Sequence, residues 1–186
     1  MSSQTARRYF TIDEYNRMDE AGLLREDDRV ELIEGEILKM SPIGSRHAAC
    51  VNRLNAKLTS LLLDRAVVSV QNPIVLGDFT EPQPDIAILR HRNDFYSSAH
   101  AGAAEVHFLI EVADTSIIYD RQGKLPIYAL SEIPEVWIVD LSAEAVEVYT
   151  EPLRGAYQNS RAFRRGESVV PLRFPDLVIP VASILD

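Results

Sequence analysis

A nearly continuous apolar run, residues 106–112, constrains this chain more than any other stretch, because it carries Glu111 near its end. Such a run is typical of a central strand that is covered on both faces. Burying a carboxylate there is costly unless something compensates its charge. A second acid, Asp85, opens another apolar run at 86–89. A divalent cation held between the two acids would compensate both charges and would also provide chemistry.

Length and composition favour one globular domain, residues 1–186. Hydrophobic residues make up 46% of the chain and charged residues 25%, an ordinary balance that can bury a core without disulfides. No apolar run approaches the roughly 20 residues that cross a membrane, and residues 1–8 lack the apolar segment of a signal peptide. Cys50 is the only cysteine, and the four histidines are not spaced as zinc ligands. We therefore expect a cytoplasmic protein with no membrane partner.

The formal net charge of −9 opposes nonspecific binding to nucleic acid, which normally relies on a basic excess. Two stretches, 46–65 and 154–173, are locally basic. Each is either a binding edge or a solvated face.

Hydrophobic periodicity and turn residues predict a mixed central β-sheet flanked by helices, an α/β (α+β) fold. Thr11 and Glu14 form a capping box before the first helix, and Gly35 allows the tight turn of a hairpin. Ser45 is the predicted cap of the second helix, while Pro126 should kink the third helix or delay its start. The predicted helices are 12–21, 46–64, 118–131 and 181–185; the predicted strands are 29–34, 36–40, 66–76 (with an irregularity at 72–73), 85–89, 105–113, 136–139 and 145–150, and a C-terminal hairpin joins 157–163 to 168–172.

Strand periodicity indicates how the two acids meet. Alternate residues of a strand face one side, so Glu111 shares a side with His107, and Asp85 shares one with Ala87. If the two strands pair with both acids on one face, the carboxylates converge and repel each other until a cation or a proton is added. Mg²⁺ suits such a pair, because it binds through one or two carboxylates and keeps several waters. Lys124, on the following helix, can return to the same end of the sheet and stabilise developing charge or orient a water.

The residues Pro84-Asp85, Glu111 and Lys124 resemble the pattern of the PD-(D/E)XK nuclease superfamily, which has the restriction-endonuclease-like fold. The wider sequence is similar to the Uma-type family of putative restriction endonucleases. The matching stretches are Tyr9-Phe10-Thr11 with Glu14-Tyr15, Glu31-Leu32-Ile33-Glu34-Gly35-Glu36, Met40-Ser41-Pro42 with Arg46-His47, Gln83-Pro84-Asp85, Glu111-Val112 with Ser116, Tyr119-Asp120-Arg121 with Lys124, and Pro134-Glu135-Val136-Trp137-Ile138-Val139-Asp140.

This resemblance implies a nuclease that hydrolyses phosphodiester bonds in nucleic acid, with DNA as the expected substrate and Mg²⁺ or Mn²⁺ as the cofactor. Asp85 and Glu111 are the implied metal ligands, and Lys124 is the implied catalytic lysine. The usual position of that lysine, two residues after the glutamate, is Ala113 here, and Asp114 stands where relatives often have serine.

Glu31 and His47 also match the family and are expected to complete the catalytic pocket. Symmetric cleavage of two strands would suit a homodimer.

Simpler interpretations exist for each residue and for the whole chain. The fold could serve as a catalytically inactive interaction or accessory module, which the acidic composition and Ala113 favour, or it could hydrolyse another phosphoester. The corresponding residue-level alternatives are a strand start at Asp85, an ion pair from Glu111 to Arg121 or Lys124, a solvated Lys124, a hydrogen-bonded His47 at a helix start, a core histidine at His107 and a solvent-facing Glu31.

Overall fold

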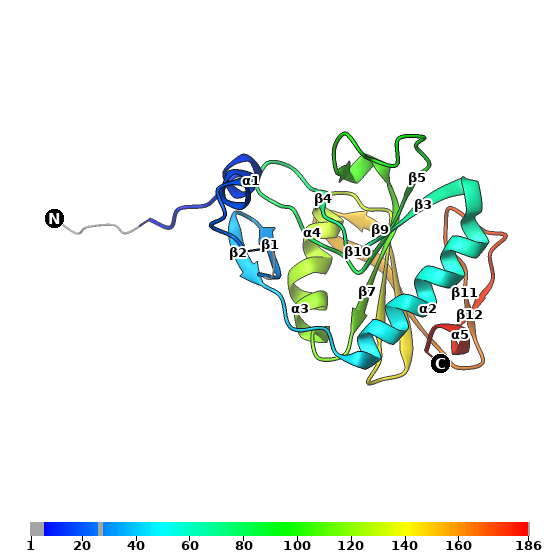
Figure 1. Cartoon of the computed structure of the whole chain (residues 1–186). Helices are drawn as coiled ribbons and strands as arrows, with labels where there is room; N and C mark the ends of the chain where they lie inside the picture. Colours follow the sequence, from blue (N-terminus) through cyan, green and yellow to red (C-terminus); the bar gives the residue numbers. More distant parts are fainter. Residues whose placement is uncertain (1–5, 26–27, 186) are drawn as a thin grey trace.

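The computed structural model describes residues 6–25 and 28–185, and its centre is a six-stranded mixed sheet (Figure 1). The strand order is β10-β9-β8-β7-β5-β3, and only the β7–β8 pair is parallel. The predicted mixed sheet is therefore confirmed. Its strands are β3 (Ala66–Val70), β5 (Ile86–Arg90), β7 (Val106–Ala113), β8 (Glu135–Asp140), β9 (Ala145–Leu153) and β10 (Ala156–Arg164).

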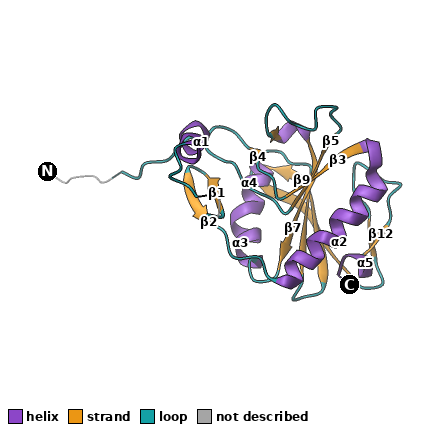
Figure 2. Cartoon of the chain, in the orientation of Figure 1, coloured by secondary structure: helices purple, strands orange, loops and turns teal. Residues whose placement is uncertain are grey.

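Helices cover the sheet on two sides, and each side has its own apolar core (Figure 2). Helix α2 (Ser45–Leu62) packs its Leu54–Leu58 stripe against one face. The predicted helix 46–64 is confirmed, but its predicted cap is wrong: Gly44 precedes the helix without a side-chain bond, and Ser45 is already helical. Within the described residues, no helix is both long and apolar enough to cross a membrane.

The helix after β7 is broken into three parts, as Pro126 predicts. It consists of α3 (Ile117–Tyr119), the π-helical turn η3 (Asp120–Lys124) and α4 (Leu125–Leu130). Proline has no N–H to donate to the preceding turn, so the regular hydrogen-bond pattern cannot continue through it. The wider turn places Asp120 and Lys124 on the buried side of the helix.

A sharp break divides the predicted strand 66–76. After β3, Gln71 takes a left-handed φ of 51°, and the chain leaves the central sheet. The next strand, β4 (Ile74–Val75), instead pairs in parallel with β6 (Ala101–Gly102). The predicted irregularity is thus a complete change of sheet, and it directs the Gln71 side chain toward Asp85.

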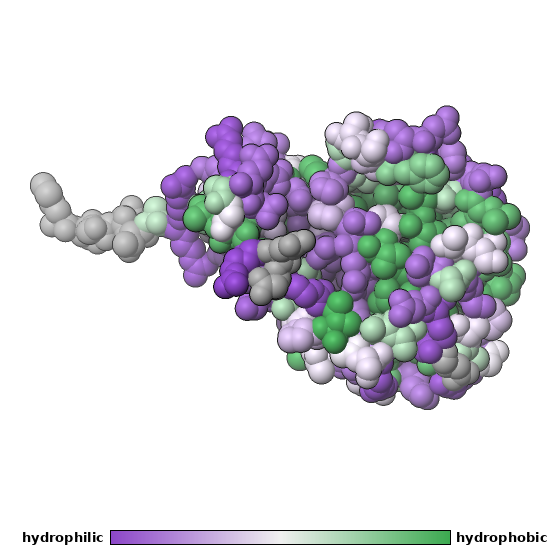
Figure 3. All heavy atoms as spheres, in the orientation of Figure 1, coloured by the Kyte–Doolittle hydropathy of each residue, from purple (hydrophilic) through white to green (hydrophobic). Residues whose placement is uncertain are grey.

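The amino-terminal elements form a separate small layer beside the site. The capping box before α1 (Ile12–Glu20) is confirmed, with Glu14 donating its backbone N–H to Thr11 at 3.2 Å. The hairpin of β1 (Val30–Ile33) and β2 (Glu36–Lys39) turns at Gly35, whose φ is +79°. Hydrophilic residues gather over α1 on the face shown in Figure 3, whereas hydrophobic residues show over the β3–β5 end of the sheet.

The carboxyl-terminal pairing differs from the prediction. The long strand β10 is the edge strand of the central sheet and pairs with β9, and residues 157–163 form no ladder with 168–172. Instead β11 (Ser168–Val169) pairs with β12 (Ile179–Pro180), ahead of α5 (Ala182–Leu185). The short 3₁₀ turns η1 (Leu63–Arg65) and η2 (Ala103–Glu105) complete the described elements.

A bulge at the start of β7 changes the face on which His107 lies. The register against β5 shifts by one residue, from Ile88 opposite Phe108 to Leu89 opposite Val106, so His107 is the extra residue. Its ring packs edge-on against Phe174, with ring centroids 5.4 Å apart. The expectation that His107 shares a side with Glu111 is therefore wrong, because strict alternation fails at the bulge.

Candidate active site

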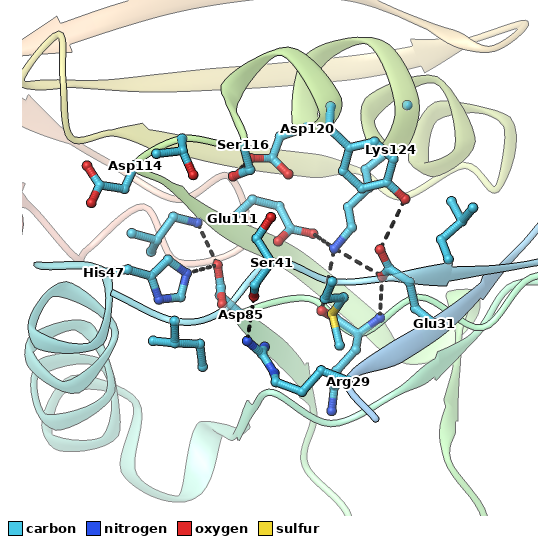
Figure 4. Close-up of a pocket in the computed structure, with 18 of the residues that line it drawn as sticks. Arg29, Glu31, Ser41, His47, Asp85, Glu111, Asp114, Ser116, Asp120 and Lys124 are labelled. Carbon is cyan, nitrogen blue, oxygen red and sulfur yellow. Dashed lines mark hydrogen bonds and ion pairs between the residues drawn. The ribbon is translucent and has the colours of Figure 1, made fainter. Parts of the chain in front are cut away.

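Antiparallel pairing of β5 with β7 brings the two predicted metal ligands together at one end of the sheet. Ile86 lies opposite Ile110, so the next pair in the same register is Asp85 and Glu111. Both acids line a cavity of about 880 Å³ that also contains Glu31, together with His47 and Lys124. The five residues predicted from the sequence thus share one cavity, although they come separately from β1, α2, the residue before β5, β7 and η3 (Figure 4).

Asp85 is held as an ionised carboxylate by three hydrogen bonds. Its Oδ2 lies 2.9 Å from His47 Nε2 and accepts the Val112 N–H at 2.8 Å, while its Oδ1 accepts from Gln71 Nε2 at 3.2 Å. Burial alone would raise the pKa of Asp85, but the bond and charge of His47 and these other donors outweigh burial and lower the pKa. His47 therefore fixes Asp85, and among the described residues its own Nδ1 has no partner.

At Glu111, unlike Asp85, burial outweighs the hydrogen-bond donors and raises the pKa of the carboxyl group. Its Oε1 accepts from Lys124 Nζ at 3.2 Å and from the Tyr128 hydroxyl at 2.5 Å. Burial, with the nearby charges of Asp85 and Asp120, raises the pKa of Glu111 to about 8 in spite of these donors. In the part of the chain that the structure describes, Oε2 accepts no hydrogen bond, and Figure 4 shows this end of the side chain facing Asp85.

Lys124 is a buried cation held between two acids. Its Nζ lies 3.2 Å from both Glu31 Oε2 and Glu111 Oε1, and 3.5 Å from the Gln83 carbonyl oxygen. Burial alone would lower the pKa of Lys124, but the surrounding carboxylates raise it, so the amine stays charged. The alternative of a solvated lysine is therefore wrong for this side chain, which is only 5% exposed.

Glu31 is also buried, at 2% exposed, which excludes the solvent-facing alternative. Besides Lys124 it accepts the Tyr119 hydroxyl at 3.1 Å and the Gln83 N–H at 3.2 Å. These contacts tie the amino-terminal hairpin to η3, so Glu31 positions the lysine from the side of the cavity opposite Glu111.

Asp120 is a residue of the cavity that the sequence-based site did not include. It is 4% exposed, accepts from the Ser116 hydroxyl at 2.6 Å, and has a pKa that burial raises. The available signal was its position four residues before Lys124, which places both on one side of a helix. Arg121, by contrast, turns away and pairs with Glu147, so it is not the counter-ion of Glu111.

Asp114 lies at the rim rather than in the centre of the site. Its Oδ1 pairs with Arg46 at 3.2 Å, and Figure 4 shows it apart from the other acids. The extra charge at this position is therefore neutralised by the start of α2.

The donor set fits a small hard cation bound by a carboxylate pair. Among the described residues there is no group of three or more His, Cys, Asp or Glu side chains arranged as a metal site. Asp85 and Glu111 nevertheless supply two adjacent carboxylates, and Mg²⁺ characteristically binds through one or two carboxylates and retains water.

Comparison with solved structures shows first which fold this chain shares. A crystal structure described as a putative nuclease belonging to DUF820, from Anabaena variabilis ATCC 29413, has 18% sequence identity to this chain and a TM-score of 0.73. The alignment covers 95% of this chain and 97% of that one, so the two share the whole fold. A search of curated proteins found no match.

The family model named Uma2, described as putative restriction endonuclease, matches residues 12–182. The chain therefore belongs to this family, and the resemblance noted from its sequence is confirmed.

Proposed function

We propose that this protein is a metal-dependent endonuclease that hydrolyses phosphodiester bonds in DNA. The observation that carries the proposal is the meeting of Asp85, Glu111 and Lys124 in one cavity at the end of the central sheet. Membership of a nuclease family supports the reaction class. The divalent metal, the DNA substrate and the residue roles are our own assignments.

Each residue has a defined role in this proposal. Asp85 and Glu111 would hold Mg²⁺ or Mn²⁺, which when bound supplies Lewis acidity and a more acidic water. Lys124, kept charged by its acidic neighbours, would orient the attacking water or stabilise negative charge on the phosphate. His47 orients Asp85, and Glu31 orients Lys124, through the contacts described above.

In this proposal a lysine from another element, Lys124, replaces the lysine that is missing at Ala113. Ala113 ends β7 and is 1% exposed, so a long cation there would have to be accommodated in the core. Lys124 instead reaches Glu111 from the π-helical turn on the adjacent layer. This arrangement supports Lys124 as the functional substitute for the lysine of the simplest motif.

DNA must approach a protein whose net charge is −9. Besides Lys124, two cations, Arg29 and Lys39, line the same cavity as the acids and would contact the phosphate backbone there. A homodimer would place two such cavities on the two strands, in keeping with the two-fold symmetry of duplex cleavage. The homodimer, the cytoplasmic location and the single domain over residues 1–186 stay predictions.

Cleavage assays test the proposal directly. Supercoiled plasmid and defined oligonucleotides are incubated with the protein in Mg²⁺, in Mn²⁺ and in EDTA, alongside Asp85→Asn and Glu111→Gln. Glu20→Gln, an exposed position on α1, is the matched control. We expect metal-dependent cleavage that the control retains and both site variants lose. Cleavage that persists in EDTA, or in both site variants, would overturn the proposal.

A second candidate, a nuclease fold that binds without cleaving, is favoured by one specific observation. Lys124 already forms ion pairs with both Glu31 and Glu111, so its positive charge compensates these acids without a metal ion. In this case calorimetry would detect no binding of Mn²⁺, whereas the endonuclease proposal expects binding that Asp85→Asn abolishes.

A further inference from the structure

A second cavity, of about 700 Å³, lies at the end of the sheet opposite the candidate active site. Arg90 ends β5 there, and His107 lies at the start of β7. Arg65, at the end of η1, and Arg173, in the carboxyl-terminal segment, complete its basic lining. Each of the two locally basic stretches of the sequence thus contributes one arginine to this cavity.

The positive charge of this cavity is not balanced by the protein. Arg65 makes a two-pronged ion pair with Asp176, at 2.7 and 2.8 Å. Arg90 and Arg173, by contrast, have no side-chain hydrogen bond or ion pair to any residue that the structure describes, and Glu132 is the only acid lining the cavity. This is unusual in a chain with 28 acids and 19 lysines and arginines, where acidic partners are abundant.

The two unpaired arginines lie close enough to His107 to act on it. Burial first, and then the charges of Arg173 and Arg90, lower the pKa of His107. The bulge in β7 turns this ring toward Phe174 and away from the active site, and neither ring nitrogen bonds to a described residue. Two guanidinium groups and an imidazole without partners therefore surround one space.

We propose that this cavity binds a phosphate group. Arginine presents a planar fork of donors that matches phosphate oxygens, and its weak hydration favours such contacts. The cavity is separate from the candidate active site, because no residue lines both cavities and His107 and Glu111 lie toward opposite ends of β7. The inference does not depend on nuclease activity.

The phosphate can come from two sources, the backbone of a nucleic acid or a free phosphate ion or ester. Guanidinium groups recognise both sources in the same way, so the experiment tests each source with a ligand of its own. Calorimetry with inorganic phosphate tests the free anion, and fluorescence anisotropy with a labelled oligonucleotide in EDTA tests the backbone. The test variant is Arg90→Gln/Arg173→Gln, and the control of equal charge is Arg17→Gln/Arg161→Gln, since both control positions are exposed and outside the cavity.

For a free-anion site, we expect wild type and control to bind inorganic phosphate, and the test variant to bind it at least about tenfold more weakly. The NMR signals of the His107 ring should shift during the same titration. For a backbone site, only the oligonucleotide should bind, again about tenfold more weakly to the test variant than to the control. Because all four substitutions are at exposed positions, circular dichroism should show unchanged folding. Equal affinity of test and control variants for both ligands, or no binding of either ligand to wild type, would overturn the inference.

Discussion

Replacement of Lys124 by methionine should destabilise the protein strongly, because it removes the one cation of the described residues that contacts both Glu31 and Glu111. Lys124 Nζ is 3.2 Å from Glu31 and 3.2 Å from Glu111, and all three side chains are at most 6% exposed. Methionine has a similar length and no charge, so packing changes little while both carboxylates lose their counter-ion.

The expected magnitude follows from the burial of this group. Removing one partner of a buried ion pair costs about 3–5 kcal/mol, whereas a pair in water is worth roughly 0–1 kcal/mol. Lys124 belongs to the first class, so we expect Lys124→Met to lower the free energy of unfolding by about 3–5 kcal/mol. For a domain of this size the melting temperature should fall by roughly 6–20 °C, at about 2–4 °C per kcal/mol.

Urea unfolding followed by circular dichroism measures this loss. The exposed pair of Arg7 and Glu36 provides the control, since its side chains are 79% and 46% exposed and Arg7→Met should change little. A second variant, Lys124→Met/Glu111→Gln, should recover part of the stability because one uncompensated carboxylate is removed. Equal stability of Lys124→Met and wild type would refute the assignment of Lys124 as a buried counter-ion.

Three further changes should have measurable effects. His47→Ala should weaken Mn²⁺ binding by about 10–100-fold in calorimetry, because His47 orients the proposed ligand Asp85 at 2.9 Å. Glu81→Gln should stabilise the protein at pH 8 but not at pH 4. Burial raises the pKa of Glu81 above its ordinary 4.5, so the wild type loses stability as pH rises through the folded pKa. Gly35→Ala should cost about 1–3 kcal/mol in urea unfolding, because φ is +79° and the new Cβ would lie 2.6 Å from Tyr9 Cβ.

Each of these predictions has a clear contrary result. Unchanged Mn²⁺ affinity in His47→Ala would show that the histidine does not support the metal site. A stability difference for Glu81→Gln that is the same at both pH values would show that ionisation of Glu81 is not responsible. Gly77→Ala, with φ +84° and no atom within 4 Å of the new Cβ, controls for backbone strain alone. Equal losses at Gly35 and Gly77 would mean that the contact with Tyr9 contributes nothing.

Much of the architecture could be predicted because local patterns and tertiary structure agree. The capping box at Thr11, the apolar stripe of α2 and the apolar run of β7 each specify an element that packing then uses. The failures occur where a single backbone event changes the pattern. Gln71, at φ 51°, ends β3 early. The bulge at His107 places that side chain on the face of the sheet opposite to the one that strict alternation predicts.

The residues of the candidate site could be predicted from the sequence, but their ion pairs and burial could not. An acid within a buried strand and an acid at the start of another indicate a charged cluster, and family resemblance adds Glu31, His47 and Lys124. The sequence could not show that Lys124 bridges two acids, because this depends on the π-helical turn and on the docking of β1. Asp120 was missed for the same reason, since its burial is set by that turn.

A crystal structure of the protein soaked in Mn²⁺ would test the central claim most directly, because anomalous scattering locates the ion without reference to activity. The account predicts one Mn²⁺ bound by carboxylate oxygens of both Asp85 and Glu111, with Lys124 still in the same cavity. An ion bound elsewhere, or no ion at this site in crystals of a protein that cleaves DNA, would contradict it.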